Sequence, residues 1–384
     1  MSRLTAAFAA EKKSNKGFMI LSFFGILFVL DAHIGTSIRF FSGIFPYDSF
    51  FMPMFVFISG YFYKESHSET YGAVIRYALH KAKTLLIPYL FWVFAYGVLT
   101  AGMGRLGILR FGGHSVSVIF REVLTSGWSY GFNDPSWFVP LLYCVSVLYC
   151  VFRKVFGNGW NDWAAALCLI LLGVCAVYLS KTEFNTPRHY MLLKVGFFLQ
   201  FYHLGQLFQK HLEIHFDRIN ALLLCVLAAA VNIILLRFYG DSISFPNCAS
   251  MENFTMDNLL LPLLTSVTGI AFWLKLSKTL VPVLGCNRLV QYISSNTFFL
   301  MTHHLFGKWV FHGLLLVGKK LGISFLAGVD SGRFVSDPWY TFGQHTWIAA
   351  VCFLFMLAFC VCACALLQKI KACCLRRRGS SPKC

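Results

Sequence analysis

The chain has 384 residues, of which 57% are apolar and only 13% charged, and its 33 Lys and Arg against 16 Asp and Glu give a net charge of +17. Soluble globular domains carry about 45–50% apolar and about 25% charged residues, so this chain lacks the charges that coat a water-exposed surface. A mean hydropathy of +0.64 also excludes a disordered chain. We therefore predict an all-α, polytopic integral membrane protein.

Long apolar runs divide the chain into spans of roughly the 20 residues that a helix needs to cross a bilayer. In chain order, the predicted spans are 17–38, 50–63, 85–101, 136–152, 163–180, 189–209, 219–237, 258–274, 289–310 and 346–368. They define a polar N-terminal segment at 1–16, a transmembrane domain at 17–368 and a basic tail at 369–384. The first span is too long for a signal-peptide core and lacks a clear cleavage site, so we expect it to be retained. Ten crossings place both termini in the cytoplasm.

The distribution of charge among the loops supports this topology. The loops and termini predicted to be cytoplasmic hold 21 cations and six acids, and those on the outer side hold 11 cations and nine acids. The balance is +15 inside and +2 outside, as the positive-inside rule requires. The basic composition therefore reflects orientation in a membrane, which we expect to be a bacterial cytoplasmic membrane, and not nucleic-acid binding, which needs a solvated basic face.

Ionisable side chains inside apolar spans are costly and mark functional sites. The first span ends in Asp31 and His33, whose two-residue spacing directs them about 200° apart on a helix. The ninth span contains Asn296 and the adjacent pair His303 and His304. Histidine suits general-base chemistry because its pKa lies near neutrality. These histidines are therefore the first catalytic candidates.

None of these histidines is expected to bind a metal. Vicinal His303 and His304 diverge on a helix, which argues against a shared ion. His211 and His215 are spaced i,i+4, but they lie in a charged loop and lack the Glu of a metalloprotease motif. The sequence therefore predicts no metal site.

A basic segment precedes the third predicted span and contains Arg76, Lys81 and Lys83. These charges either fix the topology or attract a phosphorylated cofactor, for which lysine acts as a point charge. The outer segments 102–135 and 311–345 are polar and contain glycines, so we expect them to fold back as re-entrant or capping elements.

Several short strings, each weak alone, occur in a recognisable order and spacing. They are Leu27–His33, Phe45–Phe50, Met52–Phe62, Lys81–Lys83, Pro88–Tyr89, Asn133–Phe138, Phe201–Gly205, Asn296–Thr297 and His303–Phe306. Together they resemble the acyltransferase 3 family of integral membrane proteins that O-acylate glycans, and in particular its fucose 4-O-acetylase-like branch. The resemblance covers most of the chain.

This resemblance implies an O-acyltransferase that takes an acyl group from cytoplasmic acyl-CoA, here expected to be acetyl-CoA. The group would pass to a hydroxyl of a cell-surface glycan or lipid-linked sugar. In the family the histidine that ends the first span is the essential catalytic residue, which corresponds to His33. The basic residues that bind acyl-CoA correspond to Lys81 and Lys83, with Arg76 nearby. The family often has a cation eleven positions before the histidine, where this chain has Ser22.

The resemblance and the residue chemistry together suggest roles for the site. His33 is expected to accept a proton from the acceptor hydroxyl. A hydrogen bond to the oxyanion is expected from one of three residues, which are His303, His304 and Asn296. The residues expected to contact the sugar are Trp137, Tyr47 and Asn133.

A membrane transporter or flippase of a glycan-synthesis pathway is the alternative, because ten helices with buried polar residues also suit a carrier. The sequence shows no paired halves with matching broken helices, and Asp31 is the one acidic residue inside the predicted spans. An accessory scaffold is a third class, which would need no single histidine.

Overall fold

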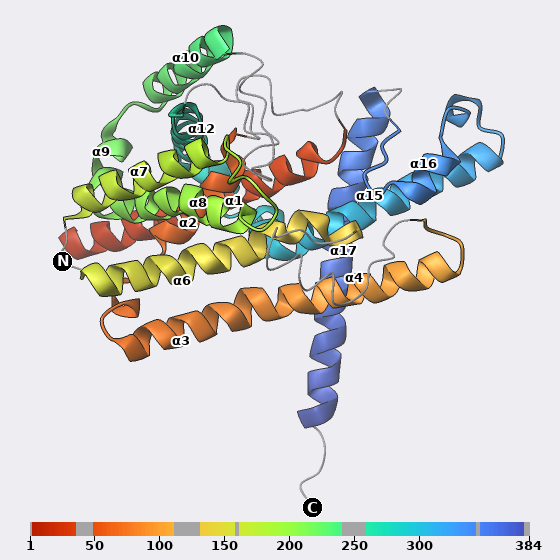
Figure 1. The fold of residues 1–384 in the computed structure, drawn as a ribbon, viewed down its shortest axis with the longest axis horizontal. Helices are drawn as coiled ribbons and strands as arrows, with labels where there is room; N and C mark the ends of the chain where they lie inside the picture. Colours follow the sequence, from red (N-terminus) through yellow and green to blue (C-terminus); the bar gives the residue numbers. More distant parts are fainter. Residues whose placement is uncertain are drawn as a thin grey trace, which may run out of the picture.

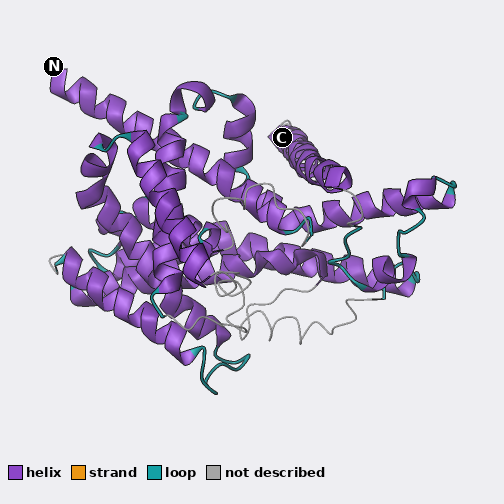
Figure 2. Ribbon diagram, turned by 90° about the horizontal axis from the view of Figure 1, so that it is seen from above, coloured by secondary structure: helices purple, strands orange, loops and turns teal. Residues whose placement is uncertain are grey.

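The computed structural model describes residues 2–35, 49–110, 131–157, 161–239, 259–342 and 346–379. Over these ranges the secondary structure is helical and contains no strand (Figure 2). The long helices are α1 (Ser2–Ala32), α2 (Phe51–Tyr61), α3 (Tyr71–Lys81), α4 (Ile87–Arg105), α6 (Phe138–Phe156), α7 (Asp162–Leu179), α8 (Tyr190–Leu207), α10 (Ala221–Tyr239), α12 (Leu261–Thr279), α15 (Thr297–Lys320) and α17 (Thr346–Gly379). The shorter helices are η2 (Glu65–His67), η4 (Gly131–Trp137), α9 (Glu213–Arg218), α13 (Val281–Leu284), α14 (Arg288–Ser295), η7 (Ser324–Leu326) and α16 (Ser331–Ser336). The all-α prediction is confirmed for the described residues, and each predicted span overlaps one or two of these helices.

Five helices within the described residues are long and apolar enough to cross a membrane. They are Tyr71–Arg105, Gly131–Phe156, Asp162–Leu179, Ala221–Tyr239 and Thr346–Cys374, and Phe51–Tyr61 is a shorter apolar helix. The helices α8, α12 and α15 carry buried polar side chains, such as Lys194, Thr265 and His304, which lower their hydropathy. The structure therefore supports a membrane protein, whereas the ten crossings and the side of each terminus stay predictions.

The third predicted span is part of a longer helix than its apolar pattern indicates. α3, a π-helical turn at Ala82–Leu86 and α4 form one continuous helix from Tyr71 to Arg105 (Figure 1). Pro88 accounts for the π turn, because proline donates no backbone hydrogen bond and its ring clashes with the carbonyl four residues earlier. Lys81 and Lys83 therefore lie on a helix and not in a loop.

The helix α8 is buried along almost its whole length and packs against α2, α6 and α7. Two glycines allow α2 to approach it closely. A Cβ on Gly60 would lie 1.8 Å from the Tyr202 carbonyl oxygen, and a Cβ on Gly205 would lie 2.1 Å from the Phe57 carbonyl oxygen. Small residues let helix backbones touch in this way inside membranes. Larger side chains are therefore excluded at this crossing.

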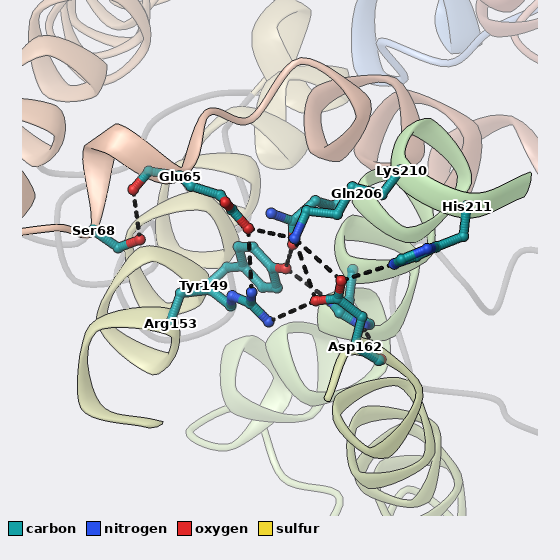
Figure 3. A network of polar contacts seen from close by, with 9 residues as sticks. Glu65, Ser68, Tyr149, Arg153, Asp162, Gln206, Lys210 and His211 are labelled. Carbon is teal, nitrogen blue, oxygen red and sulfur yellow. Dashed lines mark hydrogen bonds and ion pairs between the residues drawn. The ribbon is translucent and has the colours of Figure 1, made fainter. Parts of the chain in front are cut away.

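Ion pairs gather at one end of the bundle, here named the basic end and defined by Glu65, Arg153, Asp162, Lys210, Glu213 and Lys278. Arg153 is 1% exposed and pairs with Asp162 at 3.1 Å and with Glu65 at 3.5 Å. Lys210 contacts the same two carboxylates, and His211 Nε2 lies 2.9 Å from Asp162 (Figure 3). The network joins η2, α6, α7 and the π-helical segment Phe208–Leu212 that follows α8. All of these residues belong to loops that the sequence predicts to be on one side of the membrane.

The helix α17 runs across the other long helices and not along them (Figures 1 and 2). It packs mainly against α15 and also touches α1. Helices that cross in this way cannot both run along the normal of a flat bilayer. The span predicted at 346–368 is helical as expected, and its crossing of the membrane stays a prediction.

Candidate active site

The end of α1 and the first third of α15 meet at a pair of histidines. The two helices pack together, and His33 Nδ1 lies 2.8 Å from His304 Nε2. The ring centroids are 4.7 Å apart and the rings are inclined at 34°. His304 is fully buried, whereas His33 is partly exposed. The fold therefore brings together two of the histidines that the sequence singled out.

Carbonyl oxygens beside the pair determine which nitrogen of each ring carries the proton. His304 Nδ1 lies 3.1 Å from Leu300 O and must donate, because a carbonyl only accepts, so neutral His304 has its lone pair on Nε2. That lone pair faces His33 Nδ1, which also lies 2.7 Å from Val29 O and therefore carries a hydrogen. The lone pair of neutral His33 is then on Nε2. This arrangement suits a general base, because His304 can stabilise the imidazolium that forms when Nε2 takes a proton.

His304 belongs to a polar stripe along one face of α15. His304, Lys308 and His312 follow at intervals of four residues, which places them on one side of the helix. The buried Lys308 Nζ donates to Trp339 O at 2.9 Å, and His312 Nε2 accepts from the Phe342 backbone N–H at 3.1 Å. The stripe therefore holds residues 337–342 beside the histidine pair. This part of the outer segment 311–345 folds back, as expected, whereas 111–130 of the other outer segment lie outside the described residues.

A pocket of about 210 Å³ lies on the basic-end side of the histidine pair, and neither histidine is among its lining residues. Its mainly apolar walls come from α1, α2, α6, α15 and the π turn before α4, and they include Ser22, Leu85 and Met301. Met301 is one turn before His304. Ser22 precedes His33 by eleven residues, which is about 16 Å along the helix. On α1 the pocket is lined by Ser22 and Ile26, so its nearest wall on this helix lies seven residues, or about 10 Å along the axis, before His33.

Comparison with known proteins places this geometry in a family. A family model described as an acyltransferase domain, acyltransferase 3, matches residues 19–368, which include both histidines of the pair. The chain belongs to the acyltransferase 3 family. The protein is therefore a membrane acyltransferase, as the sequence strings indicated. No curated protein and no solved structure matches the chain.

In this acyltransferase the basic segment lies beside one wall of the pocket. Arg76 and Lys83 are exposed, Lys81 is half-buried, and Leu85, two residues after Lys83, lines the pocket. Burial and the nearby Lys81 charge lower the pKa of His67, which precedes α3 at the basic end. Desolvation is the larger of the two effects, and the cation adds to it because a nearby positive charge disfavours protonation of the ring.

His303 faces a different side of α15 from His304, because adjacent residues on a helix diverge by about 100°. Its Nδ1 lies 2.6 Å from the Tyr96 hydroxyl oxygen. Its ring also packs against Trp92 and Phe299, with centroid distances of 4.2 and 4.0 Å. His303 therefore contacts α4 and not His33, and its predicted role at the oxyanion stays a prediction.

Asn296 lies at the start of α15, two turns before His304. Its amide nitrogen donates to Tyr292 O, and its oxygen accepts from Gln368 Nε2 at 3.0 Å and from Cys364 Sγ at 3.3 Å. These contacts tie α14 to α17. The position is about 12 Å along the helix from His304, so the geometry favours a structural role for Asn296 over contact with an oxyanion at the pair.

Asn133 lies on η4 beside another face of α15. Its Oδ1 accepts from the Ser136 hydroxyl, which lies 3.4 Å from Thr302 Oγ1 of α15. Thr302 and His304 are two residues apart and so point about 200° away from each other. Asn133 is therefore separated from the histidine pair by the helix itself.

Two further residues were predicted to contact the sugar. Trp137 is half-buried, and Lys194 Nζ lies over its ring at 4.5 Å from the centroid, in a cation–π contact. Tyr47 falls outside the described residues. Among the described residues, Trp137 shows no contact with the histidine pair, and its role stays a prediction.

The sequence alone did not identify Trp339, whose ring centroid is 5.1 Å from that of His33. Trp339 lies in an irregular segment, where no periodicity indicates which way a side chain points. The stripe of α15 did carry a readable signal. Its polar residues at i, i+4 and i+8 in an otherwise apolar helix mark a face that contacts protein and not lipid.

Proposed function

We propose that this acyltransferase moves an acyl group from acyl-CoA to a hydroxyl of a glycan or lipid-linked sugar, with His33 as the general base. The observation that carries the proposal is the histidine pair. His304 orients His33 with its lone pair on Nε2, the His33 ring is partly exposed, and an apolar pocket lies about one turn away on α15, at Met301.

The acyl donor is proposed to bind from the basic end. Arg76, Lys81 and Lys83 supply positive charge for the phosphates of CoA, since lysine and arginine both attract such groups. The apolar pocket suits the flexible pantetheine arm, whose thioester end would then lie at the Met301 wall, one turn before His304 on α15. Ser22 lines this pocket where family members often have a cation, so the pocket stays uncharged. The basic end is then the cytoplasmic end, in agreement with the charge balance of the loops.

The reaction follows from the assigned proton positions. His33 Nε2 takes the proton of the acceptor hydroxyl, and the oxygen attacks the thioester carbonyl carbon, so that a C–O bond forms. The C–S bond then breaks, and the sulfur leaves with the proton from His33 as the CoA thiol. His304 Nε2 accepts the Nδ1–H of the transient imidazolium throughout. No metal is needed for this proton transfer.

The acceptor is proposed to reach His33 from the opposite end of the bundle, which would be the outer side of a bacterial cytoplasmic membrane. The partly exposed His33 ring at the end of α1 supports this direction. The resemblance to the fucose 4-O-acetylase-like branch favours an acetyl group. It also favours a deoxysugar or related pyranose in a surface polysaccharide as the acceptor.

Purified protein in detergent with acetyl-CoA and no glycan tests this function against a transporter or scaffold. We expect saturable binding of acetyl-CoA and slow release of free thiol as water replaces the acceptor, and the release should be lost in His33→Gln. The exposed His215 at the basic end provides a matched control, because His215→Gln removes a histidine far from the pair. A transporter or scaffold would release no thiol above a protein-free blank, either as wild type or as His215→Gln.

Loss of a glycan acetyl group in a deletion strain, measured by mass spectrometry against its parent, would identify the acceptor. An unchanged glycan profile combined with full thiol release would instead place the acceptor among small sugars or lipids.

A further inference from the structure

Trp339 is the aromatic side chain that borders the histidine pair on its exposed side. Its ring centroid lies 5.1 Å from that of His33, and the two rings are inclined at 44°. Trp339 is 38% exposed, and His33 is itself partly exposed. The two rings therefore form an open corner, of which one wall is an apolar indole face and the other is the proposed base.

The backbone around Trp339 is fixed by several hydrogen bonds. Its N–H donates to Asp337 Oδ1 at 2.8 Å, and its carbonyl accepts from Lys308 Nζ at 2.9 Å and from Thr341 Oγ1 at 3.1 Å. On the α1 side, a Cβ on Gly35 would lie 2.9 Å from Thr341 Cγ2, so the segment also presses closely on the end of α1. The indole is therefore held beside His33 by both helices of the pair.

The buried neighbours of Trp339, and not burial of its own ring, hold this tryptophan in place. Tyr340 and Phe342, on either side of Thr341, are buried, and the Tyr340 hydroxyl accepts from the Asp330 backbone N–H at 2.8 Å. These two side chains anchor the segment. By contrast, the larger indole of Trp339, which directly precedes Tyr340, keeps more than a third of its surface exposed. An exposed indole on a backbone fixed in this way is typical of a ligand contact and not of a core residue.

We propose that Trp339 is the acceptor platform, on which the ring of a pyranose lies so that one hydroxyl at its edge reaches His33 Nε2. This inference rests on the proposed function and names the class of acceptor within it. A pyranose has a face of C–H groups that packs on an indole and a rim of hydroxyls. In the corner between the two inclined rings, the indole would pack on the C–H face and His33 would meet the hydroxyl rim. Lys308 is a positioning residue, because it fixes the Trp339 carbonyl and does not reach the acceptor itself.

The apolar pocket is a less suitable site for a sugar than the exposed corner at Trp339. The pocket toward the basic end is closed by apolar side chains such as Met301 and Phe298 and suits a flexible arm. A ring with hydroxyls on its rim would bury unpaired polar groups there, at a cost in free energy. The exposed corner leaves the remaining hydroxyls of the sugar outside the apolar pocket.

Kinetics of purified protein in detergent with acetyl-CoA and a panel of methyl pyranosides test this proposal, with glycerol as an acceptor without a ring. We expect Trp339→Ala to raise the KM of the best pyranoside by about 3-fold to 10-fold, the range of one aromatic contact. The KM should rise less in Trp339→Phe, which keeps an aromatic face. The KM for acetyl-CoA, thiol release to water and transfer to glycerol should be unchanged. Trp347→Ala is the matched control, because Trp347 is 53% exposed and lies on α17.

Three outcomes separate the possible failures. Wild-type thiol release with no difference in pyranoside KM between Trp339→Ala and Trp347→Ala would overturn the platform and leave the proposed function standing. An equal fall in thiol release and in transfer would also overturn it, because Trp339 would then only hold His33 in place. Absence of thiol release by the wild-type protein would overturn the proposed function and the platform together.

Discussion

The substitution His304→Phe tests whether the buried histidine supports the base. Phenylalanine occupies nearly the same space but offers no acceptor to His33 Nδ1, which now lies 2.8 Å from His304 Nε2. The His33 Nδ1–H keeps its contact with Val29 O at 2.7 Å, so the base should stay in place and lose only one partner. The effect should therefore fall on the charged state that forms during the reaction.

The size of this effect follows from the hydrogen bond that is lost. A hydrogen bond to a charged group contributes about 1.5–3 kcal/mol, and each 1.36 kcal/mol corresponds to tenfold in rate. We therefore expect kcat to fall by about 10-fold to 150-fold. The KM for acetyl-CoA should change little, because the pocket wall nearest the pair is formed by Met301 and not by His304.

Transfer of radiolabel from acetyl-CoA at several donor concentrations separates kcat from KM. His304→Gln is the informative second variant, because its amide oxygen can accept from His33 Nδ1–H and should recover part of the lost rate. A kcat within twofold of wild type for His304→Phe, or a change confined to KM, would refute the assignment of His304 as the partner of the base.

Three further tests concern the donor site and the fold. Replacing Lys81 and Lys83 together by Gln should raise the KM for acetyl-CoA without lowering kcat, and added salt should then affect KM less than in wild type, because salt screens the charges of the half-buried Lys81 and the exposed Lys83; an unchanged KM would refute their role. Arg153→Met should lower the stability by about 3 kcal/mol, at the lower end for a buried pair because its carboxylates keep another cation, and a melting temperature equal to wild type in detergent would refute this. Gly60→Ala should destabilise by about 1–3 kcal/mol or more through overpacking against α8. By contrast, Gly102→Ala, with nothing within 4 Å of the added Cβ, should be neutral or slightly stabilising; equal melting temperatures for these two variants would contradict the close helix crossing.

Apolar run length was enough to predict where the helices lie, and it was weaker on where they end. The run at 85–101 ends near the observed end of α4, yet the helix begins at Tyr71, because lysine is a good helix former and Lys81 and Lys83 interrupt the apolar run without breaking the helix. The run at 289–310 is interrupted at Asn296, where α14 ends and α15 begins. Hydropathy does not register such a break, because the break depends on backbone hydrogen bonds and not on the apolarity of the side chains.

The sequence predicted the histidines of the candidate site but not which of them would pair. His33 and His304 were both selected as costly ionisable groups in apolar spans, but no spacing rule links residues on different helices. His303 was equally prominent in the sequence, and only the rotation of α15 shows that it faces Tyr96. Trp339 carried no signal, because an irregular segment has no period from which its direction follows. Long-range packing thus supplied the information that local patterns lack.

The most direct test of the central claim is the transfer of radiolabel from acetyl-CoA to glycan in membranes that carry wild type or His33→Gln at equal protein levels. Glutamine can still donate and accept hydrogen bonds but cannot act as a base at neutral pH. Loss of a general base lowers rates by about 10²-fold to 10⁴-fold, so we predict transfer at least about 100-fold below wild type, with acetyl-CoA binding retained. Transfer near the wild-type rate would contradict the assignment of His33 as the base.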